Sequence, residues 1–157
     1  MAGPARDSGD AADAVARTLA VVGDAWTLLI LRDAFYGVRR FEDFRRNLGI
    51  ARNILSHRLK RLVEQGLFEK RQYSDRPLRY EYRFTDRGRD LFGVLVALQA
   101  WGDRWARDEP GRMTLTHLGC GRHAHAVPAC SECGEPLDPH NVRVDPVPVV
   151  PEVRRRR

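Results

Sequence analysis

Apolar residues recur along the first two thirds of the chain, first at helical and then at strand spacing. Val15, Leu19 and Val22 share one face of a helix that begins near Asp13 and stops at Gly23. The segment "DAWTLLILRDAFYG" predicts a second, strongly apolar helix, which we expect at the centre of the core. A short amphipathic helix follows in "RRFEDFRRNLG", with its aromatic residues inward and its last arginines outward.

Residues 51–65 form the next predicted helix, and its two faces differ in chemistry. Three leucines at i, i+4 and i+7 make one apolar stripe: Leu55, Leu59 and Leu62. At about 100° per residue, polar side chains point the opposite way. They are Asn53, His57, Lys60 and Glu64, with Ser56 at the margin. Gly66 ends this helix, where a left-handed residue is usual.

A hairpin and a long helix complete the pattern. "LFEKRQY" and "RYEYRFT" alternate with the two-residue period of strands and are joined by "SDRPLR". Thr85 is expected to cap a helix over residues 86–106, with an apolar seam of Leu91, Leu95, Leu98, Trp101 and Trp105. This order predicts a mainly α protein with a small β-hairpin (α+β). It is that of a winged helix-turn-helix with flanking helices.

The distribution of charge favours a nucleic-acid partner. The net charge is +6 and the isoelectric point is near 9.8. Between Arg39 and Arg89 there are fifteen Lys or Arg against seven Asp or Glu, so this segment alone carries +8. A basic centre in an otherwise nearly neutral chain is typical of a protein that binds nucleic acid, although a solvated charged face gives the same composition.

The polar face of the helix at 51–65 carries groups suited to base edges in the major groove. An asparagine can bond adenine through both amide atoms, a serine or histidine can serve several bases, and a lysine can reach guanine or a phosphate. Arginines beside them would hold backbone phosphates, and those of the hairpin loop would enter the minor groove. The predicted DNA-binding residues are Arg45, Arg46, Arg52, Asn53, Ser56, His57, Lys60, Arg61, Arg76 and Arg79.

A plain solvated helix surface is the alternative for residues 51–65 taken alone. The short helix before it and the hairpin after it also supply cations, and we expect all three on one side. That agreement favours DNA over the alternatives, which are an RNA-binding or protein-docking winged helix.

These residues resemble the HxlR family of bacterial transcriptional regulators. The resemblance runs from about Asp13 to Trp105 and rests on several motifs. They are the core Gly23, Trp26, Ile30, Leu31 and Arg32; Arg39-Arg40-Phe41; Tyr80-x-Tyr82; Phe84-Thr85; and Trp101-Gly102. It implies a homodimer joined by the first helix and the helix at 86–106. The recognition helix, about 51–65, would enter the major groove, and the wing, 73–80, would lie on the minor groove and backbone.

Two departures from the family pattern bear on this expectation. Asp13 stands where many members carry a cysteine that senses electrophiles or oxidants, and a carboxylate forms no disulfide. Ala51 stands where a capping serine often begins the recognition helix. We expect repression rather than activation, and an unknown small-molecule effector is a further possible partner. Trp26, Phe92 and Trp101 could line its cavity, or simply pack as an aromatic core.

Three cysteines crowd into "HLGCGRHAHAVPACSECGEPL", beyond the winged helix. His117-x-x-Cys120 and Cys130-x-x-Cys133 are each followed by a glycine, as in the knuckles of a zinc ribbon. We therefore predict a structural Zn²⁺ held by His117, Cys120, Cys130 and Cys133. His123, His125 and His140 are the alternatives for the histidine ligand. The family resemblance extends to a subset with such a cysteine-containing tail.

A redox-active C-x-x-C is the main rival to zinc, and unreactive cysteines are the third possibility. A metal site that opens on oxidation would make the tail the switch of a redox- or metal-responsive regulator. An enzyme is not expected. "PACSEC" resembles half of a zinc deaminase motif, but the H-x-E that such enzymes require is absent. No Walker loop, dinucleotide fingerprint or catalytic triad is present.

The predicted organisation has four parts. Residues 1–12 are a disordered tail, 13–108 the DNA-binding and dimerisation domain, 113–145 the zinc-ribbon-like element, and 146–157 a flexible tail rich in proline and arginine. No apolar run approaches the roughly 20 residues that cross a bilayer, and the N-terminus lacks a secretory signal, so we expect a cytoplasmic protein.

Overall fold

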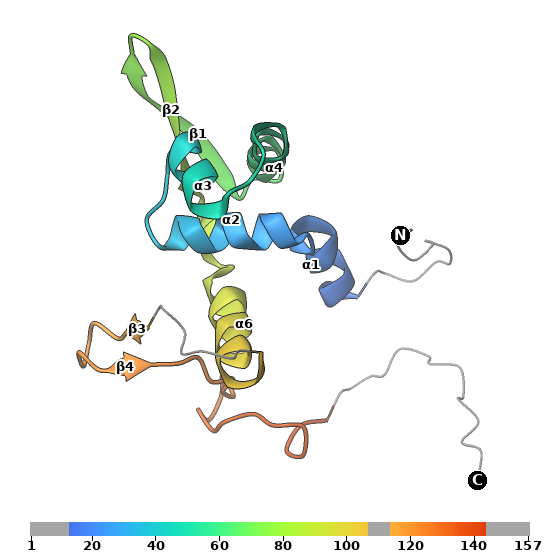
Figure 1. The fold of residues 1–157 in the computed structure, drawn as a ribbon. Helices are drawn as coiled ribbons and strands as arrows, with labels where there is room; N and C mark the ends of the chain where they lie inside the picture. The colour runs from blue at the N-terminus through green and yellow to red at the C-terminus, as the bar shows by residue number, and fades with distance from the viewer. Residues whose placement is uncertain (1–12, 107–113, 144–157) are drawn as a thin grey trace. The chain divides into compact units, whose positions relative to one another are not determined.

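The computed structural model describes residues 13–106 and 114–143, which fall into two units divided after Gln99. The first unit holds α1 (Ala14–Val22), α2 (Ala25–Phe35), α3 (Phe41–Leu48), α4 (Arg52–Glu64), β1 (Phe68–Asp75), β2 (Leu78–Phe84), α5 (Asp86–Arg89) and the start of α6 (Phe92–Trp105) (Figure 1). The end of α6, β3 (Leu115–Thr116) and β4 (His123–Ala124) belong to the second unit. The predicted domain bounds of 13–108 and 113–145 stay a prediction, and the predicted tails at 1–12 and 146–157 lie outside the described residues.

Side-chain caps fix where the first helices begin. The Asp13 carboxylate accepts from the Val15 N–H at 3.2 Å, at the position where the periodicity placed the start of the helix. Asp24 accepts from the Thr27 N–H at 3.1 Å, and its other oxygen accepts from Arg58 Nη2 of α4 at 2.9 Å. A single carboxylate therefore both starts α2 and ties α4 to it.

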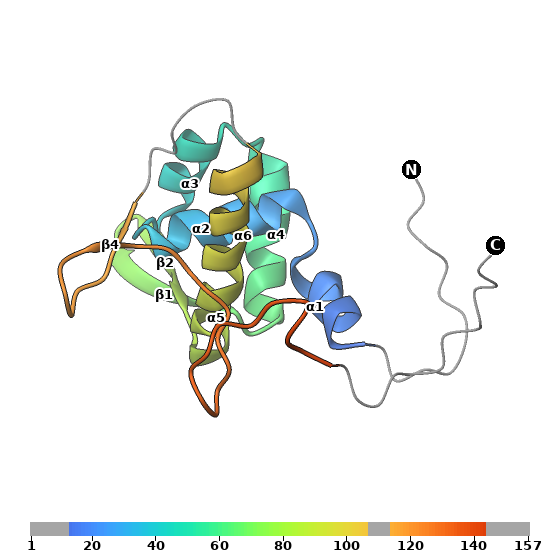
Figure 2. The ribbon, with the colours of Figure 1, turned by 90° about the horizontal axis from the view of Figure 1, so that it is seen from below.

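The core lies where α2, α3, α4 and the base of the hairpin meet. Helix α2 contacts both α3 and α4 (Figure 2). Ile30, Leu31 and Phe44 are fully buried, as are the predicted leucines of α4, Leu55 and Leu59. Leu62, the third leucine of that stripe, is 2% exposed. The predicted inward face of α4 is thus confirmed, and burying it commits the opposite face to solvent.

The hairpin is antiparallel and longer than the sequence suggested. Phe68 pairs with Phe84 and Asp75 with Leu78, with a bulge between Gln72 and Ser74. We predicted a loop over residues 74–79, but only Arg76 and Pro77 separate the strands, because the pairing continues across the polar residues 74 and 75. An isolated bridge between Arg40 and Glu81 joins the hairpin to the residue that precedes α3.

The prediction of a single helix over residues 86–106 is wrong, since α5 ends at Arg89 and α6 begins at Phe92. Thr85 does cap the first piece: its Oγ1 accepts from the Gly88 N–H at 3.1 Å and donates to the Gly66 carbonyl at 2.6 Å. A β-carbon on Gly88 would lie 2.1 Å from the Leu67 carbonyl oxygen. The short helix therefore docks against the turn between α4 and β1, and residues 90 and 91 separate it from α6.

Helix α6 has no fully buried residue in the isolated chain. Leu91, just before it, and Leu95 pack against the core of the first unit, but the rest of the predicted seam is exposed. Leu98 is 50%, Trp101 62% and Trp105 65% exposed. Among the described residues, no single helix is both long and apolar enough to cross a membrane, and α1 with α2 meets that test only as a pair bent by 81°.

Candidate nucleic-acid interface

The outward face of α4 presents unengaged polar groups to solvent. Asn53, Ser56 and His57 are exposed, and within residues 13–106 and 114–143 no hydrogen bond occupies their side chains. Lys60 is also exposed and lies 3.7 Å from Glu64, an ordinary i,i+4 surface pair. The amide, hydroxyl, imidazole and ammonium groups are therefore available together along one side of the helix.

The start of α4 lacks a side-chain cap, as the alanine at position 51 implies. Ala51 is the N-cap and makes no side-chain hydrogen bond. Because the first N–H groups of a helix have no partner within the helix, this end favours an anion. Arg52 follows, and its guanidinium lies over the Phe41 ring at 5.2 Å.

One predicted arginine of α4 is engaged by another helix. Arg61 Nη2 donates to the Ala20 carbonyl of α1 at 3.0 Å. The guanidinium is therefore held at the end of α1. Its predicted DNA contact remains a prediction that this geometry does not favour.

Acidic residues in the first turn of α3 hold the arginines of its last turn. Arg45 Nε lies 2.9 Å from Glu42, and Arg46 Nη2 lies 3.2 Å from Asp43. Glu42 also accepts from Arg52 Nη2 at 2.5 Å. The hydrogen bond from Arg45 is the main cause that lowers the pKa of the Glu42 carboxyl below its usual value. Desolvation opposes it, and the charges of Arg52, Arg45 and Arg46 add to the lowering.

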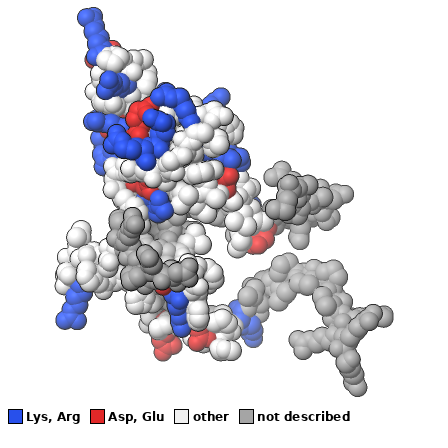
Figure 3. All heavy atoms as spheres, viewed as in Figure 1, with Lys and Arg blue, Asp and Glu red and all other residues white. Residues whose placement is uncertain are grey.

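A groove of about 510 Å³ separates the start of α3 from the hairpin. Its lining comprises Arg40, Phe41, Glu42, Asp43, Arg52, Tyr73, Arg79 and Tyr80. The Arg40 guanidinium stacks on Tyr73 at 4.6 Å, and Lys70 stacks on Tyr80 at 3.9 Å. Figure 3 shows the surface of this part of the molecule, with acidic atoms set among Lys and Arg.

Sequence reasoning identified two arginines of this groove, Arg52 and Arg79, but missed Arg40 and both tyrosines. Arg40 reaches the hairpin because its backbone bridges Glu81, and because the Tyr82 N–H donates to the Arg39 carbonyl at 2.8 Å. Alternating aromatic and basic residues in both strands were the available signal. The sequence does not show, however, which basic residue lies against which aromatic ring.

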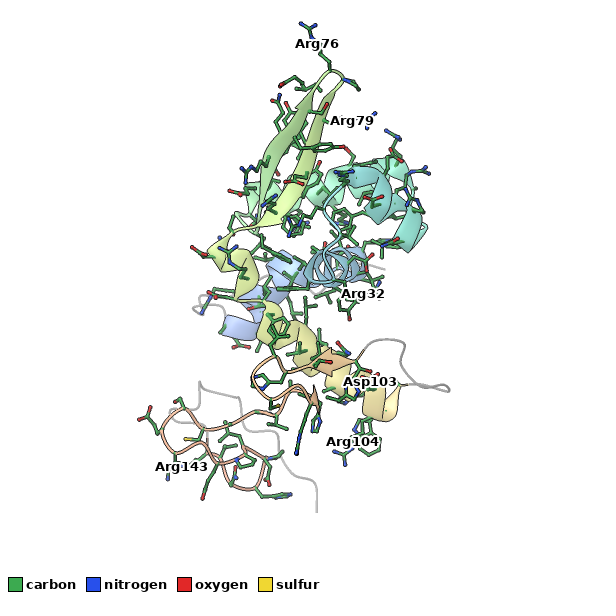
Figure 4. All side chains as sticks on the ribbon, turned by 90° about the vertical axis from the view of Figure 1, so that its left-hand side faces the viewer. Arg32, Arg76, Arg79, Asp103, Arg104 and Arg143 are labelled. Carbon is green, nitrogen blue, oxygen red and sulfur yellow. The ribbon has the colours of Figure 1, made fainter. Side chains whose placement is uncertain are left out.

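The tip of the hairpin is exposed and cationic. Arg76 projects away from the rest of the protein at the turn (Figure 4), and Leu78 beside it is 58% exposed. The predicted cations therefore come from three elements: α3, α4 and the hairpin.

The cysteines lie in two turns of the second unit. In the first, which joins β3 and β4, His117 Nδ1 lies 3.4 Å from Cys120 Sγ. In the second, the Gly134 N–H donates to the Cys130 carbonyl at 2.9 Å, and Ala129 bridges Pro136. Gly121 and Gly134, the glycines that follow the cysteines, have φ of 68° and 76°. Both turns thus have the left-handed residue that lets a backbone wrap around a sulfur.

The spacing of the ligand atoms in the first turn can be compared with that of a zinc site. A tetrahedral zinc with Zn–N about 2.0–2.1 Å and Zn–S about 2.3 Å separates the two ligand atoms by roughly 3.5 Å, close to the His117–Cys120 distance. Backbone N–H groups of Cys133 and then Glu132, and after them the Cys133 side chain, lower the pKa of the Cys130 thiol, which favours the thiolate that metals bind. Within the described residues, however, no three His, Cys, Asp or Glu come together as a metal-binding group.

The aromatic residues considered for an effector cavity are packed or exposed. Trp26 packs against the core, Phe92 lies 5.4 Å from the Phe35 ring, and Trp101 belongs to the second unit. A separate groove of about 560 Å³ lies beside α1, with Val21, Val22 and Leu91 among its lining. The effector remains a prediction.

The helices α2, α3 and α4 are followed by a paired hairpin, and α4 presents one polar face to solvent. This arrangement defines a winged helix-turn-helix protein of the kind found in transcription factors. The HxlR-like helix-turn-helix family matches residues 21–110. The chain belongs to that family, and it is a transcriptional regulator rather than an enzyme.

Relatives extend the resemblance into the second unit. An uncharacterized HTH-type transcriptional regulator of Mycobacterium tuberculosis is 50% identical over 137 residues, which cover 87% of each chain. Among solved structures, PA1607, a proposed transcription factor, superposes with a TM-score of 0.75 at 37% identity, covering 87% of this chain and 96% of that one. Matches of this length must run beyond the winged helix.

A third relative matches a smaller share of this chain. The redox regulator HypR in its reduced form matches with a TM-score of 0.56 at 29% identity, over 59% of this chain and 92% of its own. The family match at residues 21–110 contains α4 and the hairpin.

Proposed function

We propose that the protein is a homodimeric, sequence-specific regulator of double-stranded DNA, and a repressor. In this proposal α4 lies in the major groove, where Asn53, Ser56, His57 and Lys60 read base edges. Arginines of α3 and the start of α4 hold backbone phosphates, and Arg76 and Arg79 of the hairpin reach the minor groove. Repression would follow from occupying a promoter.

The observation that carries the proposal is the division of α4 into two faces. Its leucines are buried against the core while Asn53, Ser56 and His57 stay exposed, with no bonding partner among the described residues. If α4 were only a solvated surface helix, there would be no reason for cations of two neighbouring elements to lie beside its polar face. Here the arginines of α3 and of the groove beside the hairpin accompany them.

The homodimer is supported by apolar side chains that the single chain leaves in water. Val15 and Leu19 of α1 are 62% and 59% exposed. In α6, Leu98 is 50%, Trp101 62% and Trp105 65% exposed. Helices with apolar faces are stable when those faces are buried against a partner. A two-fold dimer would also present two copies of α4 to successive turns of one duplex.

A selection experiment tests the DNA-binding proposal and identifies the operator sequence at the same time. The full-length protein is used to select duplexes from a random-sequence library, and affinities are then measured for the selected site and for random duplex. Asn53→Ala and Lys60→Ala should each weaken binding to the selected site by roughly tenfold or more, with dimerisation unchanged. Arg76→Ala with Arg79→Ala should weaken both duplexes alike.

Gln65→Ala is the matched control, because it removes an amide at the opposite end of the same helix. It should bind like the wild-type protein. If Asn53→Ala and Lys60→Ala kept both affinity and sequence preference, the assignment of α4 to the major groove would be wrong.

A structural zinc in the second unit is the accompanying proposal. Its support is the pair of preformed turns, with His117 against Cys120 and Cys130 against Cys133. Zinc bound to these four side chains would join the two turns and fold a segment that has few apolar groups to bury. A cysteine pair that releases the metal on oxidation would add a redox response. No contact among the described residues favours such a response over a purely structural zinc.

A further inference from the structure

The arginines proposed to hold DNA phosphates already have anionic partners inside the protein. Glu42 accepts from Arg45 Nε at 2.9 Å and from Arg52 Nη2 at 2.5 Å, so one carboxylate joins α3 to the start of α4. Arg52 and Glu42 belong to different helices, and the pair therefore depends on how α3 and α4 pack. A carboxylate offers an arginine the same planar, two-oxygen acceptor that a phosphate does.

These ion pairs lie at a preformed cationic groove. Glu42 and Arg52 both line the 510 Å³ groove, together with Arg40, Arg79 and Asp43, whose carboxylate is paired with Arg46. Arg52 is stacked on Phe41 and Arg40 on Tyr73, so both guanidiniums are held by rings instead of moving freely in solvent. A phosphate that entered the groove would find these arginines in place and Glu42 bound to one of them.

The Glu42 pairs are easily exchanged, because both partners are exposed. The side chains of Arg45 and Glu42 are each 50% exposed, and that of Arg52 is 71% exposed. Such surface pairs contribute little to the stability of a fold, since solvent screens them. Replacing the carboxylate by a phosphate therefore costs the protein little structure, but the carboxylate must be displaced or repelled whenever DNA binds.

We propose that the groove between α3 and the hairpin is a binding site for a DNA backbone phosphate and that Glu42 is its internal competitor. This inference rests on the proposed function. In the free protein Glu42 occupies Arg45 and Arg52, and a phosphate of the duplex takes its place on binding. The carboxylate lowers affinity for every duplex, which leaves binding more dependent on the base contacts of α4.

Glu42 then sets how tightly the protein holds any duplex, without touching a base. Phosphate contacts supply nearly all non-specific affinity, so a fixed negative charge among them weakens binding to random and selected duplexes alike. At a given protein concentration, random duplex is then left largely unbound, while a site that also satisfies α4 stays occupied. Low occupancy of random duplex is the physical gain that this negative charge offers.

The test measures binding of the full-length protein to a fluorescently labelled random-sequence 30-base-pair duplex over a range of salt concentrations. Glu42→Gln keeps the shape and a hydrogen-bond acceptor but removes the charge. It should bind this duplex about fivefold more tightly at low salt, and log K should fall with log[salt] more steeply, by roughly one unit of slope. Arg40→Gln, which removes a groove cation, should bind more weakly.

Asp86→Asn is the matched control. Asp86 lies in the first turn of α5 and pairs with Arg89 three residues later, as Glu42 does with Arg45. It lines no part of the groove. The substitution makes the same change in net charge, and we expect it to alter affinity for the random duplex by less than about twofold. Thermal midpoints of both variants show whether the fold is retained.

A double-mutant comparison separates local competition from general charge. If Glu42 acts by occupying Arg45 and Arg52, Glu42→Gln should have no more effect than Asp86→Asn when both arginines are glutamine. The inference is overturned if Glu42→Gln has the control's effect in the wild-type background, keeps its full effect without the arginines, or weakens binding. A wild-type protein that binds no duplex would instead refute the proposed function.

Discussion

Close packing at single residues decides the geometry of the base of the hairpin. Gly88 lies so near the Leu67 carbonyl and the Phe84 ring that a β-carbon would sit 2.1 Å and 2.8 Å from them. Thr85 binds the same region, donating to the Gly66 carbonyl and capping α5. The end of α4, the end of β2 and the start of α5 thus meet at one point that has no room for another methyl group.

Gly88→Ala should therefore destabilise the protein, by about 1–3 kcal/mol, because the added methyl forces the backbone at Leu67 to move. Chemical denaturation at a fixed protein concentration measures the change. Gly93→Ala is the control, since nothing lies within 4 Å of its added β-carbon and alanine favours a helix by up to about 1 kcal/mol. Equal stability of Gly88→Ala and the wild-type protein would contradict the packing described here.

Among the described helices, α6 is the one without a buried residue. Its first turns reach the core through Leu91 and Leu95, while Leu98 and the residues beyond it are left in water. The same is true of Val15 and Leu19 of α1. A second copy of the chain is the partner that the proposed function assigns to these faces.

Leu98→Glu should therefore weaken dimerisation by roughly thirtyfold or more, because a carboxylate at an apolar interface loses its hydration. Leu98 is 50% exposed in the single chain, so the fold itself should be unaffected. Sedimentation velocity at several concentrations measures the change. Leu78→Glu makes the same substitution at the hairpin tip and should remain dimeric. A monomeric wild-type protein, or a fully dimeric Leu98→Glu variant, would count against the interface.

At the scale of the whole molecule, the two units differ in how they are held together. The first has a contiguous apolar core drawn from α1 to β1. In the second, no described residue from 114 to 143 is buried, and the two strands are two residues each. A segment with so little burial needs another source of stability. A bound metal ion would be one, and the cysteines and His117 of the two turns could serve as its ligands.

Protein purified without added metal should therefore contain about one zinc per chain by elemental analysis. Removing it with a chelator should expose residues 114–143 to protease while the first unit stays resistant. Cys130→Ser and Cys133→Ser should lose the metal, and Ser131→Ala, in the same turn, should keep it. A metal-free wild-type protein with an equally resistant second unit would refute the site.

Much of the candidate interface could be predicted from the chain alone. The leucine spacing of residues 55–62 fixes which side of α4 is buried, and so which side offers Asn53, Ser56 and His57. The groove could not be predicted, because it depends on Arg40 pairing with Glu81 and on Tyr73 lying over Arg40. Nor could the Glu42–Arg52 pair, whose members belong to different helices.

Periodicity and caps are local properties, so the sequence by itself determined the first four helices, the two faces of α4, the hairpin and the ends at Gly23 and Gly66. Only the tertiary structure decided what those elements touch. The helix predicted over 86–106 is divided at residues 90 and 91, and Glu42 meets Arg52 of another helix as well as Arg45 of its own. Contacts between distant segments depend on how faces pack in three dimensions, and a one-dimensional pattern does not specify that packing.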